Sequence, residues 1–206
     1  MLTTVVVRVW MPDRPGALGQ VASRIGAVRG DVLGIEILEQ GADRVIDELT
    51  VSLPDADLID LLTAEIDAVD GVSVEDVRVV EADRVDPNLA ALAAAAAMAE
   101  SRPEERLEVL CRAVERMIEA DWAVVLRHGE VISQVGVSPD TAWLMAFLAG
   151  SGHLGEYDGS LPSDLAWAHL IEAGLTVAAG RVSHAIHERE RVRLSLLCRL
   201  ADALLL

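Results

Sequence analysis

Apolar residues in the first part of the chain recur with two periods, one typical of strands and one typical of helices. β-branched and apolar residues from Thr4 to Trp10 indicate a buried strand. Apolar positions then recur at helical spacing as far as Val28, and again between Leu58 and Val69. The segments "DVLGIEILEQ", "VIDELTVSL" and "VSVEDVRVV" alternate as strands do. The order strand, helix, strand, strand, helix, strand predicts a ferredoxin-like α+β unit, with a four-stranded antiparallel sheet over residues 4–81 and both helices on one face.

The rest of the chain predicts a second α+β unit. An Ala-rich segment, Leu89 to Glu100, favours a helix. After it the pattern predicts helix, hairpin, helix, a glycine-rich loop over Gly150–Ser160, a second hairpin, and a final helix from about His184. We therefore expect a first domain at residues 1–82, a linker with the Ala-rich helix at 83–102, and a second domain at 103–206.

Charge and composition narrow the classes of function. The chain has 206 residues, 52% of them hydrophobic, and a formal net charge of −17. This charge argues against a nucleic-acid partner, because the phosphate backbone is met by clustered positive charge. All 17 basic residues are arginines, which excludes lysine Schiff bases and phosphate-loop lysines. The two cysteines, Cys111 and Cys198, lie in apolar helical patterns and are expected to be buried reduced thiols.

Targeting and membrane signals are weak. The first ten residues do not combine a basic start with a long apolar block, so we expect no signal peptide. The longest apolar stretch, "LAALAAAAAMA", has about half of the ~20 residues that a membrane span needs. The expectation is a cytoplasmic protein without a membrane partner.

The segment "MPDRPGAL" directly follows the first predicted strand and has the residue types of a ligand loop. Gly16 lacks a Cβ atom, so backbone there can approach a ligand closely. The N–H groups of Ala17 and Leu18 lie at a predicted helix start, which favours a carboxylate. Asp13 can accept a hydrogen bond from an ammonium group, although it can equally cap the helix without any ligand.

The stretch from Val5 to Val80 resembles an ACT domain, a small-molecule regulatory module of amino-acid metabolic enzymes. The resemblance rests on "DRPGALGQVASRIG" after the first strand and on "RGDVLGIEIL" at the second. It implies an amino-acid site at the interface of a homodimer. The residues that it assigns to ligand binding are Met11, Asp13, Arg14, Pro15, Gly16, Ala17, Leu18 and Asp31. Amino-acid-binding members often carry Asn or Asp at the position of Asp13 and often Asn at the position of Asp31. Both positions are acids here, and Met11 stands where some members have His.

Residues 103–206 resemble a GAF-like domain. The resemblance rests on "LIEAGLTVAAGR" followed by "ERERVRLSLLCRLADAL". The residue pattern of a cyclic-nucleotide site and a cysteine placed for a bilin are both missing from the sequence. The resemblance therefore assigns no ligand to this half.

The sequence offers little for catalysis. His184 and His187 stand three residues apart near Glu188 and Glu190, but no third ligand follows at a recognisable spacing. His153 in the glycine-rich loop has no Ser or Cys motif beside it. We expect no catalytic residue, no metal and no cofactor, and hence a protein that is not an enzyme.

Three hypotheses on function stay open at this point. The first is a regulatory or sensor protein that binds an amino acid or a similar metabolite at a homodimer interface and passes occupancy to its second domain or to a protein partner. The second is an interaction subunit that uses the ACT fold only for dimerisation. The third is an enzyme whose site lies under the loop at residues 150–160.

Overall fold

The chain forms two compact units, Met1–Arg84 and Val85–Leu206, which are described one at a time. The structure is a computed structural model that describes residues 2–41, 43–151 and 164–206. Most of the loop predicted at Gly150–Ser160, including His153, lies outside these residues. The Ala-rich helix belongs to the second unit, whereas the sequence suggested a linker there.

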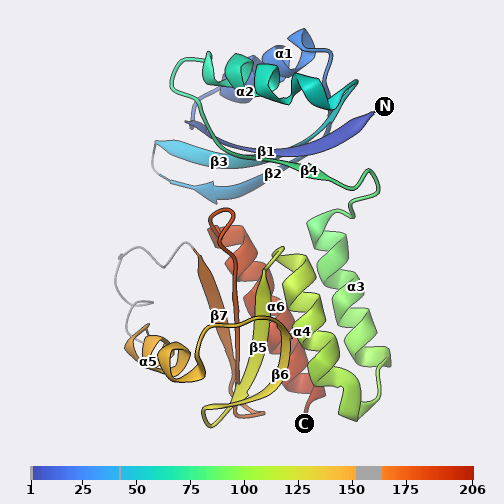
Figure 1. Cartoon of the computed structure of the whole chain (residues 1–206), viewed down its shortest axis with the longest axis vertical. Helices are drawn as coiled ribbons and strands as arrows, with labels where there is room; N and C mark the ends of the chain where they lie inside the picture. The colour runs from blue at the N-terminus through green and yellow to red at the C-terminus, as the bar shows by residue number, and fades with distance from the viewer. Residues whose placement is uncertain (1, 42, 152–163) are drawn as a thin grey trace. The chain divides into compact units, whose positions relative to one another are not determined.

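The first unit is the predicted βαββαβ arrangement (Figure 1). Its elements are β1 (Thr3–Pro12), α1 (Ala17–Ala27), β2 (Asp31–Gln40), β3 (Arg44–Leu53), α2 (Ile59–Asp67) and β4 (Ser73–Val80). The strands are antiparallel to their neighbours and stand in the order β2-β3-β1-β4, with β2 and β4 at the edges. Both helices cover the same face of the sheet, so the α+β prediction for this unit is confirmed.

Alternation along the two central strands explains which face is covered. The odd-numbered residues of β1 from Val5 to Met11 and those of β3 at 45, 49, 51 and 53 belong to one apolar core with α1 and α2. Because side chains alternate along a strand, the even-numbered residues lie on the other face. Asp47 is the one odd-numbered acid in this register of β3.

The second unit places helices on both faces of another antiparallel sheet. Its elements are α3 (Pro87–Glu100), α4 (Arg106–Met117), β5 (Trp122–Arg127), β6 (Glu130–Gly136), α5 (Thr141–Ser151), β7 (Leu165–Leu170), β8 (Leu175–Gly180) and α6 (Glu188–Leu204). The strand order is β6-β5-β8-β7. Helices α4 and α6 pack on one face and α5 on the other, while α3 packs on α4 and α6. The element order matches the sequence prediction, except that the last helix starts four residues after His184.

Candidate functional site

The loop between β1 and α1 is shaped by its glycine. Gly16 adopts φ +90°, a left-handed conformation that a side chain would strain. An ideal Cβ on Gly16 would meet nothing within 4 Å, so the space beside this backbone is open. Gly16 is also the N-cap residue of α1, and Pro15 therefore precedes the helix instead of starting it.

Two backbone donors at the start of α1 are free to bind an anion. The N–H of Ala17 donates to the Arg14 carbonyl oxygen at 3.2 Å, so the expectation that Ala17 offers a free donor is wrong. In the part of the chain that the structure describes, the N–H groups of Leu18 and Gly19 have no hydrogen-bond partner. The first turn of a helix carries partial positive charge, so these two donors suit a carboxylate.

Asp13 does not cap α1. Its Oδ2 accepts a hydrogen bond from Nε2 of Gln40, at the end of β2, at 3.0 Å. Its backbone N–H donates to the carbonyl oxygen of Asp43 at 3.0 Å. Among the described residues no side chain caps the helix, so the interpretation of Asp13 as a simple cap is wrong. Asp13 is exposed, and its carboxylate contacts the end of β2.

Asp31 lies at the opposite end of the sheet from Asp13. β2 runs in the same direction as β1, because both are antiparallel to β3. Asp31 pairs with Ser52 at one end of β2, and Gln40 contacts Asp13 at the other. Nine residue steps of about 3.3 Å separate the two ends by about 30 Å. One chain therefore does not bring Asp31 to the ligand loop.

Met11 and Arg14, which the resemblance also assigned to ligand binding, lie in different surroundings. Met11 is buried in the core of the first unit. Arg14 is exposed and borders a surface cavity of about 430 Å³ between α1 and the segment after α2. Arg24 borders the same cavity and pairs with Glu65 at 2.9 Å. This cavity is lined by the outer side of α1, and Asp13 does not border it.

Asp47 is a buried acid that the sequence analysis did not single out as a candidate site residue. Its side chain is 3% exposed, and within the described residues its Oδ1 has no hydrogen-bond partner. Burial raises the pKa of the Asp47 carboxyl above its ordinary value, and the nearby charge of Asp13 raises it further. The signal was present in "VIDELTVSL", because the alternation that puts Leu49 on the core face also puts Asp47 there.

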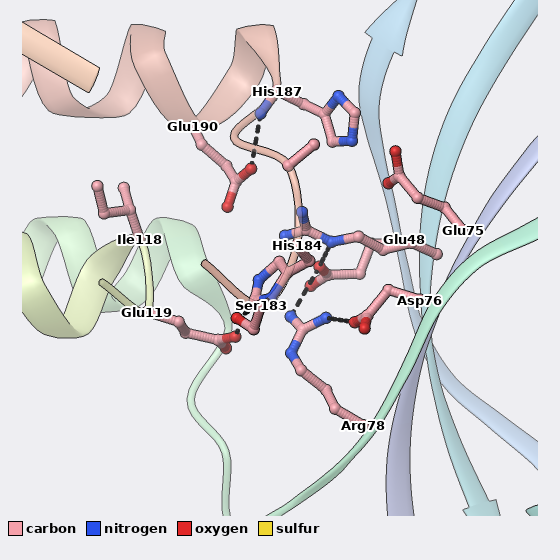
Figure 2. Close-up of polar contacts among 12 residues, drawn as sticks. Glu48, Glu75, Asp76, Arg78, Ile118, Glu119, Ser183, His184, His187 and Glu190 are labelled. Atoms are coloured by element: carbon pink, nitrogen blue, oxygen red, sulfur yellow. Dashed lines mark hydrogen bonds and ion pairs between the residues drawn. The ribbon is translucent and has the colours of Figure 1, made fainter. Parts of the chain in front are cut away.

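The opposite face of the same sheet carries a well-paired acid. Glu48 accepts from Arg8 at 2.7 Å, from Arg78 at 3.1 Å and from Arg84 at 2.9 Å. Figure 2 shows Arg78 reaching Asp76 as well, at 2.8 Å. Burial alone would raise the pKa of Glu48, but the three guanidinium groups outweigh it and lower the pKa to about 2. This cluster is a structural ion-pair network.

A buried arginine organises the second unit before α6. Arg181 forms a two-point pair with Glu190, with both N–O distances 2.9 Å. Its remaining hydrogens are donated to the carbonyl oxygens of Ile118, His184 and Ala185. All of these partners belong to the second unit, so the arginine ties the segment before α6 to the end of α4.

His184 and His187, which the sequence analysis weighed and rejected as metal ligands, lie just before and at the start of α6. His187 is the N-cap of α6, and its N–H donates to Oε2 of Glu190 at 2.9 Å (Figure 2). Glu190 is thereby engaged with both Arg181 and His187. Across residues 2–41, 43–151 and 164–206, no group of three or more His, Cys, Asp or Glu side chains could hold a metal ion.

Both cysteines are buried and free, as expected. Burial raises the pKa of Cys111, and raises that of Cys198 to about 12. These thiols are therefore poor nucleophiles at neutral pH. Of the helices that the structure describes, none is both long and apolar enough to cross a bilayer.

Comparison with known proteins identifies similar solved structures but no matching family. No family model matches the chain, and no curated protein matches it. The solved structures that are similar at low identity include the following three. An uncharacterized protein of Thermotoga maritima is 20% identical over 39% of this chain and all of its own, with a TM-score of 0.32. The ACT domain of the GTP pyrophosphokinase of Chlorobium tepidum is 16% identical over 41% of this chain and 89% of its own, with a TM-score of 0.29.

The third similar structure spans both units. It is an unknown protein of Galdieria sulphuraria, 15% identical over 88% of this chain and 99% of its own, with a TM-score of 0.36. Of these three neighbours, the one from Chlorobium tepidum is an ACT domain.

Proposed function

We propose that this chain is a non-catalytic regulatory protein whose first unit binds an amino acid at the start of α1. The ligand carboxylate would accept from the N–H groups of Leu18 and Gly19, and its ammonium would donate to Asp13. The observation that carries the proposal is this pair of unused donors beside an acid that does not cap the helix. The positive φ of Gly16 keeps the backbone open beside them.

A second copy of the chain would complete the site. The edge strand β2 exposes an apolar row, with Leu33 57%, Ile35 50% and Ile37 49% exposed. Exposed apolar edge strands tend to pair with another chain. Antiparallel pairing of two β2 strands about their centre would place Asp31 of one copy beside Gln40 of the other, and so near the partner's ligand loop. Ligand occupancy would then strengthen the dimer and be passed on to the second unit or to a protein partner.

The second candidate is an interaction subunit in which the ACT-like unit only dimerises. The same apolar row on β2 favours it, because pairing through that edge needs no ligand. The two candidates differ in one respect, namely whether a small molecule stabilises the folded protein.

A thermal-shift screen of the twenty standard amino acids separates the candidates. Binding to the folded state raises stability by about 2.7 kcal/mol at a hundredfold excess over Kd, which is a clear shift of the melting temperature. Calorimetric titration of the best binder then compares wild type with Asp13→Asn. We expect the variant to bind ten- to a hundredfold more weakly, since a charge-assisted hydrogen bond contributes about 1.5–3 kcal/mol.

Asp60→Asn is the matched control, because it makes the same change at an exposed position of α2. It should bind like wild type. If no amino acid raises the melting temperature, the binding proposal is wrong and the dimerisation candidate remains.

The dimer is tested by Ile35→Glu. A charge in the centre of the apolar row should reduce the mass in light scattering from twice the chain mass of 22.0 kDa to 22.0 kDa. Leu61→Glu, at a similarly exposed apolar residue of α2, is the control and should leave the mass unchanged. A wild-type protein that is monomeric at micromolar concentration contradicts the dimer.

A further inference from the structure

Asp47 occupies a position where a hydrophobic residue would be expected. It pairs with Val9 of β1 and with Ile37 of β2, and it points to the face covered by the helices. Its neighbours on the same face of β3 are Val45 and Leu49, both in the core. A buried carboxylate with an unused oxygen lowers the stability of the fold. The packing of the core therefore does not explain why an acid stands at position 47, and we look for a role in binding.

The carboxylate lies at the end of the sheet where α1 begins. Val9, Met11 and Val45 share one core with Ala17, the first residue of α1. Oδ2 of Asp13 accepts from Nε2 of Gln40 at 3.0 Å, and Gln40 pairs with Val45, which is two residues from Asp47 on the same face of β3. Asp13 and Asp47 thus lie towards the same end of the sheet as the first turn of α1, where the N–H groups of Leu18 and Gly19 have no partner among the described residues.

Within residues 2–41, 43–151 and 164–206, no arginine forms an ion pair with Asp47. Arg44 lies on the other face of β3, where its guanidinium sits 5.6 Å from the centre of the Trp10 ring. Arg8, which points to that same face, pairs with Glu48. Within the described residues Oδ1 of Asp47 accepts from no donor at all. The group that fits is a compact cation with several N–H donors.

We propose that Asp47 and Asp13 together bind the primary ammonium group of the ligand, with Asp47 as the buried acceptor and Asp13 as the exposed one. An ammonium has three donors and can bridge two carboxylates, whereas an acylated nitrogen has one donor and no charge. The inference rests on the proposed amino-acid function and narrows its ligand class to compounds with a free primary amine. It also assigns the anchoring role to Asp47, which the loop motif does not include.

The test is calorimetric titration with the amino acid that most raises the wild-type melting temperature. Asp47→Asn keeps the shape of the side chain and removes its charge, so it should bind at least tenfold more weakly. The N-acetyl derivative of the same amino acid should bind wild type at least tenfold more weakly. Asp60→Asn again serves as the control. The melting temperature of Asp47→Asn should equal or exceed that of wild type, which shows that lost binding is not lost folding.

A measurement on wild type makes the test independent of the variant. With ¹³C-labelled aspartate, the carboxyl resonance of Asp47 should shift when the amino acid is added. Unchanged affinity of Asp47→Asn, or an unmoved resonance, would overturn the role of Asp47 and leave the proposed function standing. Failure of all twenty amino acids to bind wild type would overturn both.

Discussion

Asp47 and Glu48 are consecutive acids of β3 that point to opposite faces of one sheet and meet opposite surroundings. Glu48 accepts from three arginines, which lower its pKa to about 2. Asp47 has an oxygen without a partner in the described part of the chain, and burial raises its pKa. Glu48 therefore stabilises the folded state at neutral pH, whereas Asp47 destabilises it. We therefore regard Glu48 as an acid that stabilises the fold and Asp47 as an acid that we propose binds a ligand.

Glu190 of the second unit extends the comparison. It is buried like Asp47, but both of its oxygens accept from Arg181, and one also accepts from the N–H of His187. Among the buried acids of the described residues, Asp47 is thus the exception. Stability measurements on each acid test whether this difference is real.

The largest effect is expected for Glu190→Gln. The change leaves the buried Arg181 without its counter-charge, and breaking a buried pair from one side costs about 3–5 kcal/mol. Urea unfolding followed by tryptophan fluorescence gives the free energy. Glu188→Gln, an exposed acid of the same helix turn, should cost less than about 1 kcal/mol. Equal costs for the two variants would contradict the structural role of the pair.

Glu48→Gln should cost about 3 kcal/mol at pH 7, because a shift of the pKa from 4.5 to about 2 corresponds to that free energy. The sign follows from linkage. A lowered folded-state pKa gives stability that is present above about pH 4.5 and is lost as the pH falls towards 2. Wild type and Glu48→Gln should therefore converge in urea unfolding as the pH is lowered through this range. A cost that does not change with pH would exclude the ion pairs as its source.

Asp47→Asn should have the opposite sign and raise stability by about 1 kcal/mol at pH 7, since it removes a buried charge without a partner. A raised folded-state pKa favours folding below the ordinary value of 3.8, and this advantage is lost as the pH rises. The gain of the variant should thus vanish towards pH 3.8 and grow above it. Urea unfolding at several pH values measures it, and a loss of stability at pH 7 would show that Asp47 has a partner inside the protein.

The smallest effect is the coupling between the two acids. Asp47 and Glu48 share no partner and lie on opposite faces, so their free-energy changes should add to within about 0.5 kcal/mol. The double variant Asp47→Asn/Glu48→Gln, unfolded in urea beside the single variants, measures this. A larger coupling would mean that the two faces do not act independently.

Local patterns were sufficient for most of the fold and for part of the site. Alternation in β3 and helical spacing in α1 and α2 correctly predicted which side chains face the core. The glycine of the loop, Gly16, adopts a left-handed conformation. The role of Asp13 could not be settled from sequence, because capping and ligand binding require the same residue type. The hydrogen bond to Gln40, which is 27 residues away, decided against capping.

The sequence by itself determined the element order, the apolar faces of the strands and the position of the "MPDRPGAL" loop. These features depend on residues that are only a few positions apart in the chain. Only the tertiary structure decided which side chains meet. The shared direction of β1 and β2 separates Asp31 from Asp13 by the length of a strand. The antiparallel pairing of β1 with β3 brings Asp47, 34 positions along the chain, towards the end of the sheet where the loop that contains Asp13 begins. Strand direction and the cover of a helix are properties of long-range pairing, and local periodicity does not encode the distances between such residues.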